Sequence, residues 1–168
     1  FSVLNHKEAC ALAVENNINV TLHADWEVPE GIKEVVLDSK AKRVGHGSQI
    51  INDISFENGS IRFKNDAAKY VFDNKIALEI CPTSNVQCGA YSNVSEHSFG
   101  ELYTAGFNVT INTDNRLMSD VTMSEEVNNV VESFGLVEKD ILSITKNTIK
   151  AGFVESRLRT GLLERLAN

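Results

Sequence analysis

The stretch VTINTDNRLMSD, residues 109 to 120, begins as a β-strand and ends in a run of polar side chains. Its first residues are β-branched or alternate in polarity, which favours an extended backbone. An adjacent carboxylate and amide, Asp114 and Asn115, follow the strand. Asp and Asn often cap helices or form turns, so capping explains either residue alone but accounts poorly for the whole run.

Strand and helix patterns alternate along the rest of the chain. Strands are expected at 18–23, 43–47, 76–81 and 107–114. Helical spacing of apolar residues is found at 5–15, 30–39, 65–74, 95–105, from 122 to near 135, and over most of 138–166. Ser95 is an expected N-cap, and Thr122 with Glu125 predicts a capping box.

Strands separated by single helices predict right-handed βαβ units and a parallel sheet, hence an α/β fold. Both an open doubly wound sheet and part of a (β/α)₈ barrel have this order. The sequence lacks the glycine-rich phosphate turn that is typical of doubly wound nucleotide-binding sheets. Polar residues recur at strand ends instead, at His23, His46 and Asp114, with the 83–85 loop after the third strand. In a TIM-type barrel this edge carries the active site.

Composition limits the partners. The formal net charge of −7 gives no electrostatic reason to expect nucleic acid or an anionic membrane surface, so a small or neutral ligand is favoured. No signal peptide or transmembrane run is apparent. Three cysteines without framework spacing indicate reduced thiols in a cytoplasmic protein.

Histidine and aspartate at neighbouring strand ends offer the nitrogen and oxygen donors that zinc prefers. A single histidine at a strand end is more often a hydrogen-bonded structural residue, but three polar strand ends are harder to dismiss. His6 and His97 belong to no motif and are expected to be structural. The set His23 and Asp114 is short for a complete zinc site.

Five segments of the chain together resemble the carboxyl-terminal half of an adenosine deaminase. They are HAD at 23–25, RVGHG at 43–47, LEICPTSNVQ at 78–87, EHSFGEL at 96–102 and VTINTDNRLMS at 109–119. The resemblance covers essentially residues 1–168, in matching order and spacing. It implies a single domain that forms the carboxyl-terminal half of a (β/α)₈ TIM barrel, with about four βα units. It also implies a hydrolase of purine salvage. Such an enzyme acts on the cyclic amidine of adenosine or deoxyadenosine and releases inosine and ammonia.

The resemblance assigns roles to four residues. His23 matches a zinc-binding histidine, and Asp114 matches the aspartate that binds zinc and orients the attacking water. His46 resembles the histidine that hydrogen-bonds the resulting hydroxide and stabilises developing charge. Asn115 stands where many family members have a second aspartate that contacts purine N7. Its amide donates a hydrogen bond at any pH.

The sequence differs from the family pattern at the residue that donates a proton to the substrate. The family reads His-Ala-Gly-Glu where this chain reads His-Ala-Asp-Trp-Glu, and an ungapped match places Trp26 at the position of the glutamate. Tryptophan is no useful acid. Glu27 is therefore the expected donor to purine N1, with Asp25 less favoured; a solvated loop carboxylate is the competing interpretation of Glu27.

The sequence also differs from the family pattern in its zinc ligands. The family's first strand supplies a His-x-His pair, which this sequence lacks. Two ligands fall short of the three or four that zinc needs. We therefore expect an incomplete fragment or a chain completed by an amino-terminal half-barrel, and expect the isolated chain to bind zinc poorly and to be inactive.

Other functions stay open. The chain is also compatible with a non-catalytic half-barrel that works by association, including self-association. An adenine or modified-adenine deaminase is the nearest enzymatic alternative. Deaminases with an H-x-E and P-C-x-x-C signature are disfavoured, because Cys81 precedes Pro82 and no Cys-x-x-Cys occurs.

Overall fold

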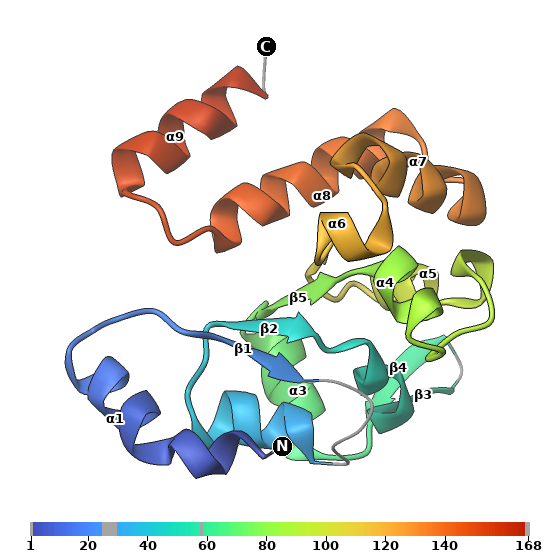
Figure 1. Ribbon diagram of the computed structural model, residues 1–168. Coiled ribbons are helices and arrows are strands. Elements are labelled where there is room, and N and C mark those ends of the chain that lie inside the picture. Colours follow the sequence, from blue (N-terminus) through green and yellow to red (C-terminus); the bar gives the residue numbers. More distant parts are fainter. Residues whose placement is uncertain (1, 25–29, 58, 167–168) are drawn as a thin grey trace. The chain divides into compact units, whose positions relative to one another are not determined.

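The computed structural model describes residues 2–24, 30–57 and 59–166 (Figure 1). The chain divides into two compact units, which are described separately. The first comprises residues 1–80 and 98–108, and the second comprises residues 81–97 and 109–168.

The α/β fold contains β1 (Thr21–Ala24), β2 (Arg43–His46) and β5 (Ala77–Ile80) in the first unit and β6 (Val109–Ile111) in the second. In the first unit β1 pairs with β2, and β2 with β5, both in parallel. The predicted parallel α/β arrangement is thereby confirmed, although each strand is shorter than its predicted range.

The register of these strands separates their side chains by face. His23 lies opposite Gly45, and Gly45 lies opposite Glu79. Val44 and Leu78, which alternate with these residues, are fully buried. One face of the sheet is therefore apolar and covered, while the other carries polar side chains.

The apolar face is covered by helices of the first unit: α2 (Gly31–Lys33), the π-helix η2 (Glu34–Asp38) and α3 (Asp66–Asp73). Val35 and Val36 of η2 are fully buried, as is Ala68 of α3. Asn65 caps α3 by accepting a hydrogen bond from the Ala68 N–H. The remaining helical elements of this unit are η1 (Val3–His6), α1 (Lys7–Glu15), η3 (Ser48–Asp53) and α5 (Phe99–Thr104).

A β-hairpin that the sequence analysis did not predict lies between β2 and α3. Its antiparallel strands are β3 (Ile54–Glu57) and β4 (Ser60–Phe63), with Ile54 opposite Phe63. The hairpin forms a separate two-stranded sheet.

The second unit combines β6 with six helical elements: α4 (Pro82–Gln87), η4 (Val94–Glu96), α6 (Arg116–Ser119), α7 (Met123–Phe134), α8 (Glu138–Ala151) and α9 (Ser156–Arg165). The predicted capping box of α7 is confirmed, and Gly135 ends this helix with a φ of 62°. The predicted Ser95 cap is wrong. Asn93 caps η4, and the chain is extended at His97 before α5 begins at Phe99.

Within the described residues, every helix is too short or too polar to cross a lipid bilayer.

Candidate functional site

Two residues predicted for the site, His46 and Asp114, have a left-handed backbone, each with a φ of 56°. This conformation is unfavourable for residues with a Cβ. The other described non-glycine residues with positive φ lie one or two residues beyond the end of a helix, where a left-handed residue is common. His46 is instead the last residue of β2, and Asp114 lies three residues after β6. Residues with backbone strain of this kind are often found at functional sites.

The first unit brings His23 and His46 together. Their ring centroids lie 4.6 Å apart, and the ring planes meet edge to face at 65°. His46 is 8% exposed, whereas His23 is exposed. The two imidazoles come from adjacent ends of parallel strands, as the sequence predicted.

Gly45 and Gly47, on either side of His46, allow close packing at the carboxyl end of β2. A Cβ on Gly47, whose φ is +70°, would lie 2.9 Å from Leu78 Cδ2 and 3.0 Å from Val44 Cγ1. A Cβ on Gly45 would lie 3.3 Å from the Cα of His23. Gly45 thus permits a close approach of β1, and Gly47 lets the chain turn over the apolar core.

The second unit holds the Asp114 carboxylate in a defined orientation. The Ser84 hydroxyl donates a 2.7 Å hydrogen bond to Asp114 Oδ2. Ser84 is buried, while Asp114 is exposed. The sequence places Ser84 in a polar loop after the third predicted strand but does not show which way its hydroxyl points.

The α4 turn that carries Ser84 is fixed by α7. The Thr83 N–H donates to Glu126 Oε1 at 2.8 Å, and Asn129 Nδ2 donates to Thr83 Oγ1 at 3.3 Å. Glu126 is fully buried. These bonds leave Ser84 little freedom to move away from Asp114.

His97 contacts Asn85 and Tyr91 within the second unit. Its Nε2 lies 3.1 Å from Asn85 Oδ1, and its ring centroid lies 4.0 Å from that of Tyr91. His97 and Asn85 are both buried.

Asn115, and not Asp114, caps the segment that follows. Its Oδ1 accepts hydrogen bonds from the N–H groups of Leu117 and Met118, each at 3.2 Å. Because the amide oxygen faces the backbone of α6, the Nδ2 donor is directed elsewhere. The side chain therefore combines a capping acceptor with a remaining donor.

The described residues provide only some of the ligands that a zinc site needs. Among residues 2–24, 30–57 and 59–166, no three His, Cys, Asp or Glu side chains form a group able to hold a metal ion. His23 and Asp114 are donors of the types that zinc prefers, but each belongs to a different unit. Glu27, Asp25 and Trp26 lie outside the described residues.

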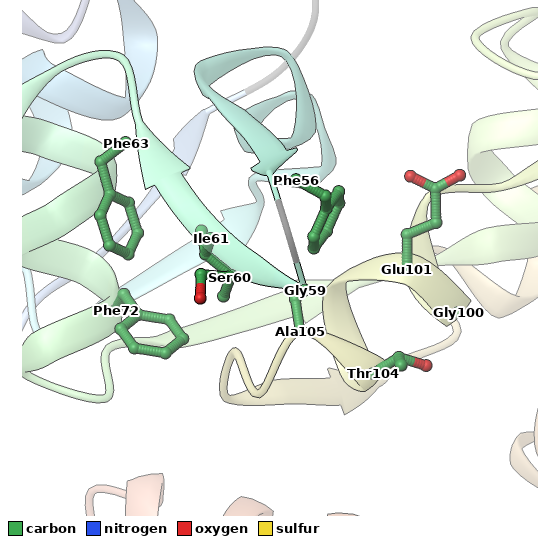
Figure 2. A pocket seen from close by; sticks show the side chains of 10 residues that line it. All are labelled: Phe56, Gly59, Ser60, Ile61, Phe63, Phe72, Gly100, Glu101, Thr104 and Ala105. Carbon is green, nitrogen blue, oxygen red and sulfur yellow. The ribbon is translucent and has the colours of Figure 1, made fainter.

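A cavity of about 750 Å³ lies elsewhere on the first unit, between the hairpin, α3 and α5. Figure 2 shows Phe63 and Phe72 beside each other at one side of it and Glu101 and Thr104 of α5 at the other. It is lined mainly by apolar side chains, and none of the predicted site residues lines it.

Comparison with protein families and curated proteins gives consistent matches. The family model described as adenosine deaminase matches residues 2–168. An adenosine deaminase from Mycobacterium sp. (strain JLS) is 40% identical over 162 residues, which are 95% of this chain and 44% of that protein. One from Mycobacterium marinum is 41% identical and covers 89% of this chain and 41% of that protein. The chain thus spans less than half the length of these relatives.

Solved structures show the same fold. The adenine deaminase from Arthrobacter aurescens superposes with a TM-score of 0.84 at 20% identity, covering 96% of this chain and 46% of that one. The Arabidopsis N6-mAMP deaminase gives 0.77 at 27% identity, covering 96% and 44%. An amidohydrolase from Burkholderia ambifaria with bound zinc gives 0.78 at 21% identity, covering 96% and 43%.

Proposed function

This chain belongs to the adenosine deaminase family, and we propose that it supplies the carboxyl-terminal half of the active site of a hydrolytic deaminase. The proposed reaction replaces the 6-amino group of adenosine or deoxyadenosine with oxygen from water and releases inosine and ammonia. The observation that carries this proposal is the edge-to-face pair of His23 and His46 at the ends of adjacent parallel strands.

In this proposal His23 and Asp114 hold a zinc ion. Imidazole nitrogen and carboxylate oxygen both suit zinc, which completes its shell with three or four ligands. Zinc lowers the pKa of water to about 7 and so provides a nucleophile at neutral pH. The other ligands would come from outside the described residues.

The chain's own groups orient the reactants. The hydrogen bond from the Ser84 hydroxyl to Asp114 Oδ2 fixes the orientation of the carboxylate, which in this proposal aligns the attacking water. His46 stabilises the negative charge that develops as the water oxygen attacks C6. Its low exposure strengthens this interaction, because little solvent screens it.

Two further groups contact the base in this proposal. Asn115 Nδ2 donates to purine N7, while its Oδ1 remains with α6. Glu27 protonates N1, which allows the C6 amino group to leave as ammonia once a second proton has been transferred to it.

We further propose that residues 1–168 form a single domain equivalent to the carboxyl-terminal half of a (β/α)₈ barrel. The extent of the matched relatives supports this assignment. An amino-terminal half-barrel, or a second copy of the chain, would complete the closure. All three cysteines are free, which fits a cytoplasmic location.

A second candidate substrate class is adenine or a modified adenine. The solved Arabidopsis structure that is 27% identical to this chain is an N6-mAMP deaminase. Such substrates share the amidine carbon and the leaving amine but differ at the ribose position or at N6. A panel of adenosine, adenine and N6-methyl-AMP distinguishes these possibilities by relative kcat/KM.

The test is an ultraviolet assay of adenosine loss by the chain alone and by the chain mixed with an amino-terminal half-barrel that carries His-x-His. Activity is expected in the mixture only and should disappear in Asp114→Ala. The matched control is Glu132→Ala, which removes an exposed carboxylate of α7. Turnover by the chain alone with stoichiometric zinc would contradict the incomplete shell, and activity retained in Asp114→Ala would contradict the proposed role of Asp114.

A further inference from the structure

Glu79 of β5 contacts both other strands of the first unit's sheet. Its Oε1 lies 3.2 Å from Arg43 Nη1 on β2, and its Oε2 accepts a 2.6 Å hydrogen bond from Thr21 Oγ1 on β1. Strand β2 lies between β1 and β5. The carboxylate therefore reaches past its neighbouring strand and links three strands through side chains.

Gly45 lies between Glu79 and β1 in the sheet of the first unit. In the strand register Glu79 lies opposite Gly45, and Gly45 lies opposite His23. Adjacent strands are about 4.8 Å apart, so β1 and β5 are separated by roughly 10 Å. A side chain at position 45 would project from the same face as Arg43, two residues earlier, and its Cβ would lie 3.3 Å from His23 Cα on β1.

The contact acts on the part of β1 that carries His23. Thr21 precedes His23 by two residues, so both side chains project from the same face of the strand. The side chains of Arg43 and Glu79 are only 23% and 22% exposed, and water therefore screens their attraction less than at an open surface. The hydroxyl bond to Glu79 is charge-assisted and shorter than a neutral hydrogen bond.

We propose that Glu79 is a positioning residue that sets the location of His23 against His46 through Thr21. This inference rests on the proposed function, in which His23 binds zinc. Glu79 touches neither metal nor substrate in this role. It holds β1 in the register and tilt that place the two imidazoles edge to face.

A purely stabilising role makes a different prediction. If Glu79 only strengthened the fold, its loss would lower the urea midpoint of unfolding but leave the histidine pair unchanged in the folded molecules. If Glu79 positions His23, the distance between the rings must change while the chain is still folded.

The test is nuclear magnetic resonance of the full chain with labelled histidines. Rings with centroids 4.6 Å apart should give a nuclear Overhauser cross-peak between His23 and His46. We expect folded Thr21→Val and Glu79→Ala to lose this cross-peak. Glu79→Gln, which keeps an acceptor oxygen for Thr21, should retain it. The control Glu57→Ala removes the exposed ion pair with Arg62 and should leave the cross-peak unchanged.

The Thr21→Val result decides the matter, because this substitution keeps a β-branched side chain and removes only the hydroxyl contact. An undiminished cross-peak in folded Thr21→Val overturns the inference, even if Glu79→Ala fails to fold. Failure of the mixed half-barrels to deaminate adenosine would overturn the proposed function and leave the resonance result intact. Deamination together with a persistent cross-peak would overturn the positioning role alone.

Discussion

The Ser84 hydroxyl and the Asp114 carboxylate, 30 residues apart in sequence, are joined by a 2.7 Å hydrogen bond. Groups that orient a metal-binding carboxylate typically change metal affinity or activity by about 10 to 100-fold when they are removed. We therefore expect Ser84→Ala to lower the kcat of the reconstituted enzyme by about 10-fold or more, with a smaller effect on KM. Steady-state kinetics measures this split. Ser95→Ala, an exposed serine of the same unit, is the control.

Asn115 is expected to act in two separable ways. Asn115→Ala removes the cap of α6 and should lower the unfolding free energy by about 1 kcal/mol. It also removes the proposed donor to N7, so KM for adenosine should rise by roughly 5 to 10-fold, as expected for one hydrogen bond. Asn115→Asp retains a good cap and should restore stability in urea titrations. An unchanged KM in Asn115→Ala would argue against a base contact.

The histidine pair could be predicted because it follows from topology. Parallel strands joined by helices end at the same edge of the sheet, so His23 and His46 had to lie near each other. The start of α7 could be predicted because the bonds between Thr122 and Glu125 are local. By contrast, the bond from Ser84 to Asp114 depends on tertiary packing of α4 against α7, which no short sequence pattern specifies.

Two local features were missed for different reasons. The alternation of Ile54 and Phe56, then Ile61 and Phe63, around an Asn-Gly pair is a local hairpin signal, but the predicted elements leave 48–64 unassigned. The predicted Ser95 cap is wrong because Asn93, two residues before Ser95, accepts the Glu96 N–H and caps η4, and α5 begins only at Phe99.

The turn at Gly47 offers a test of packing beside His46. Gly47→Ala introduces a Cβ only 2.9 Å from Leu78 Cδ2 in a left-handed backbone. Overpacking of this kind costs about 1 to 3 kcal/mol, in addition to the backbone term of about 1 to 2 kcal/mol. Gly89→Ala has a similar φ of +80° but meets nothing within 4 Å, so it should show the backbone term alone. Equal urea midpoints for the two variants would rule out the packing contribution.

Acid should weaken the start of α7 through Glu125. Hydrogen bonds from the Thr122 hydroxyl and backbone hold the pKa of Glu125 below its usual 4.5, because they favour the ionised form. The folded carboxyl group thus binds its proton less readily than the unfolded one. Its stabilising contribution is complete above the unfolded pKa and is lost as the pH falls through the lower folded pKa. Urea titrations of the wild type and Glu125→Gln should therefore differ at neutral pH and converge in acid. Glu132→Gln, on an exposed turn of the same helix, should track the wild type throughout. A gap between wild type and Glu125→Gln that stays constant down to strongly acidic pH would show that the ionised form of Glu125 has no special part in the cap.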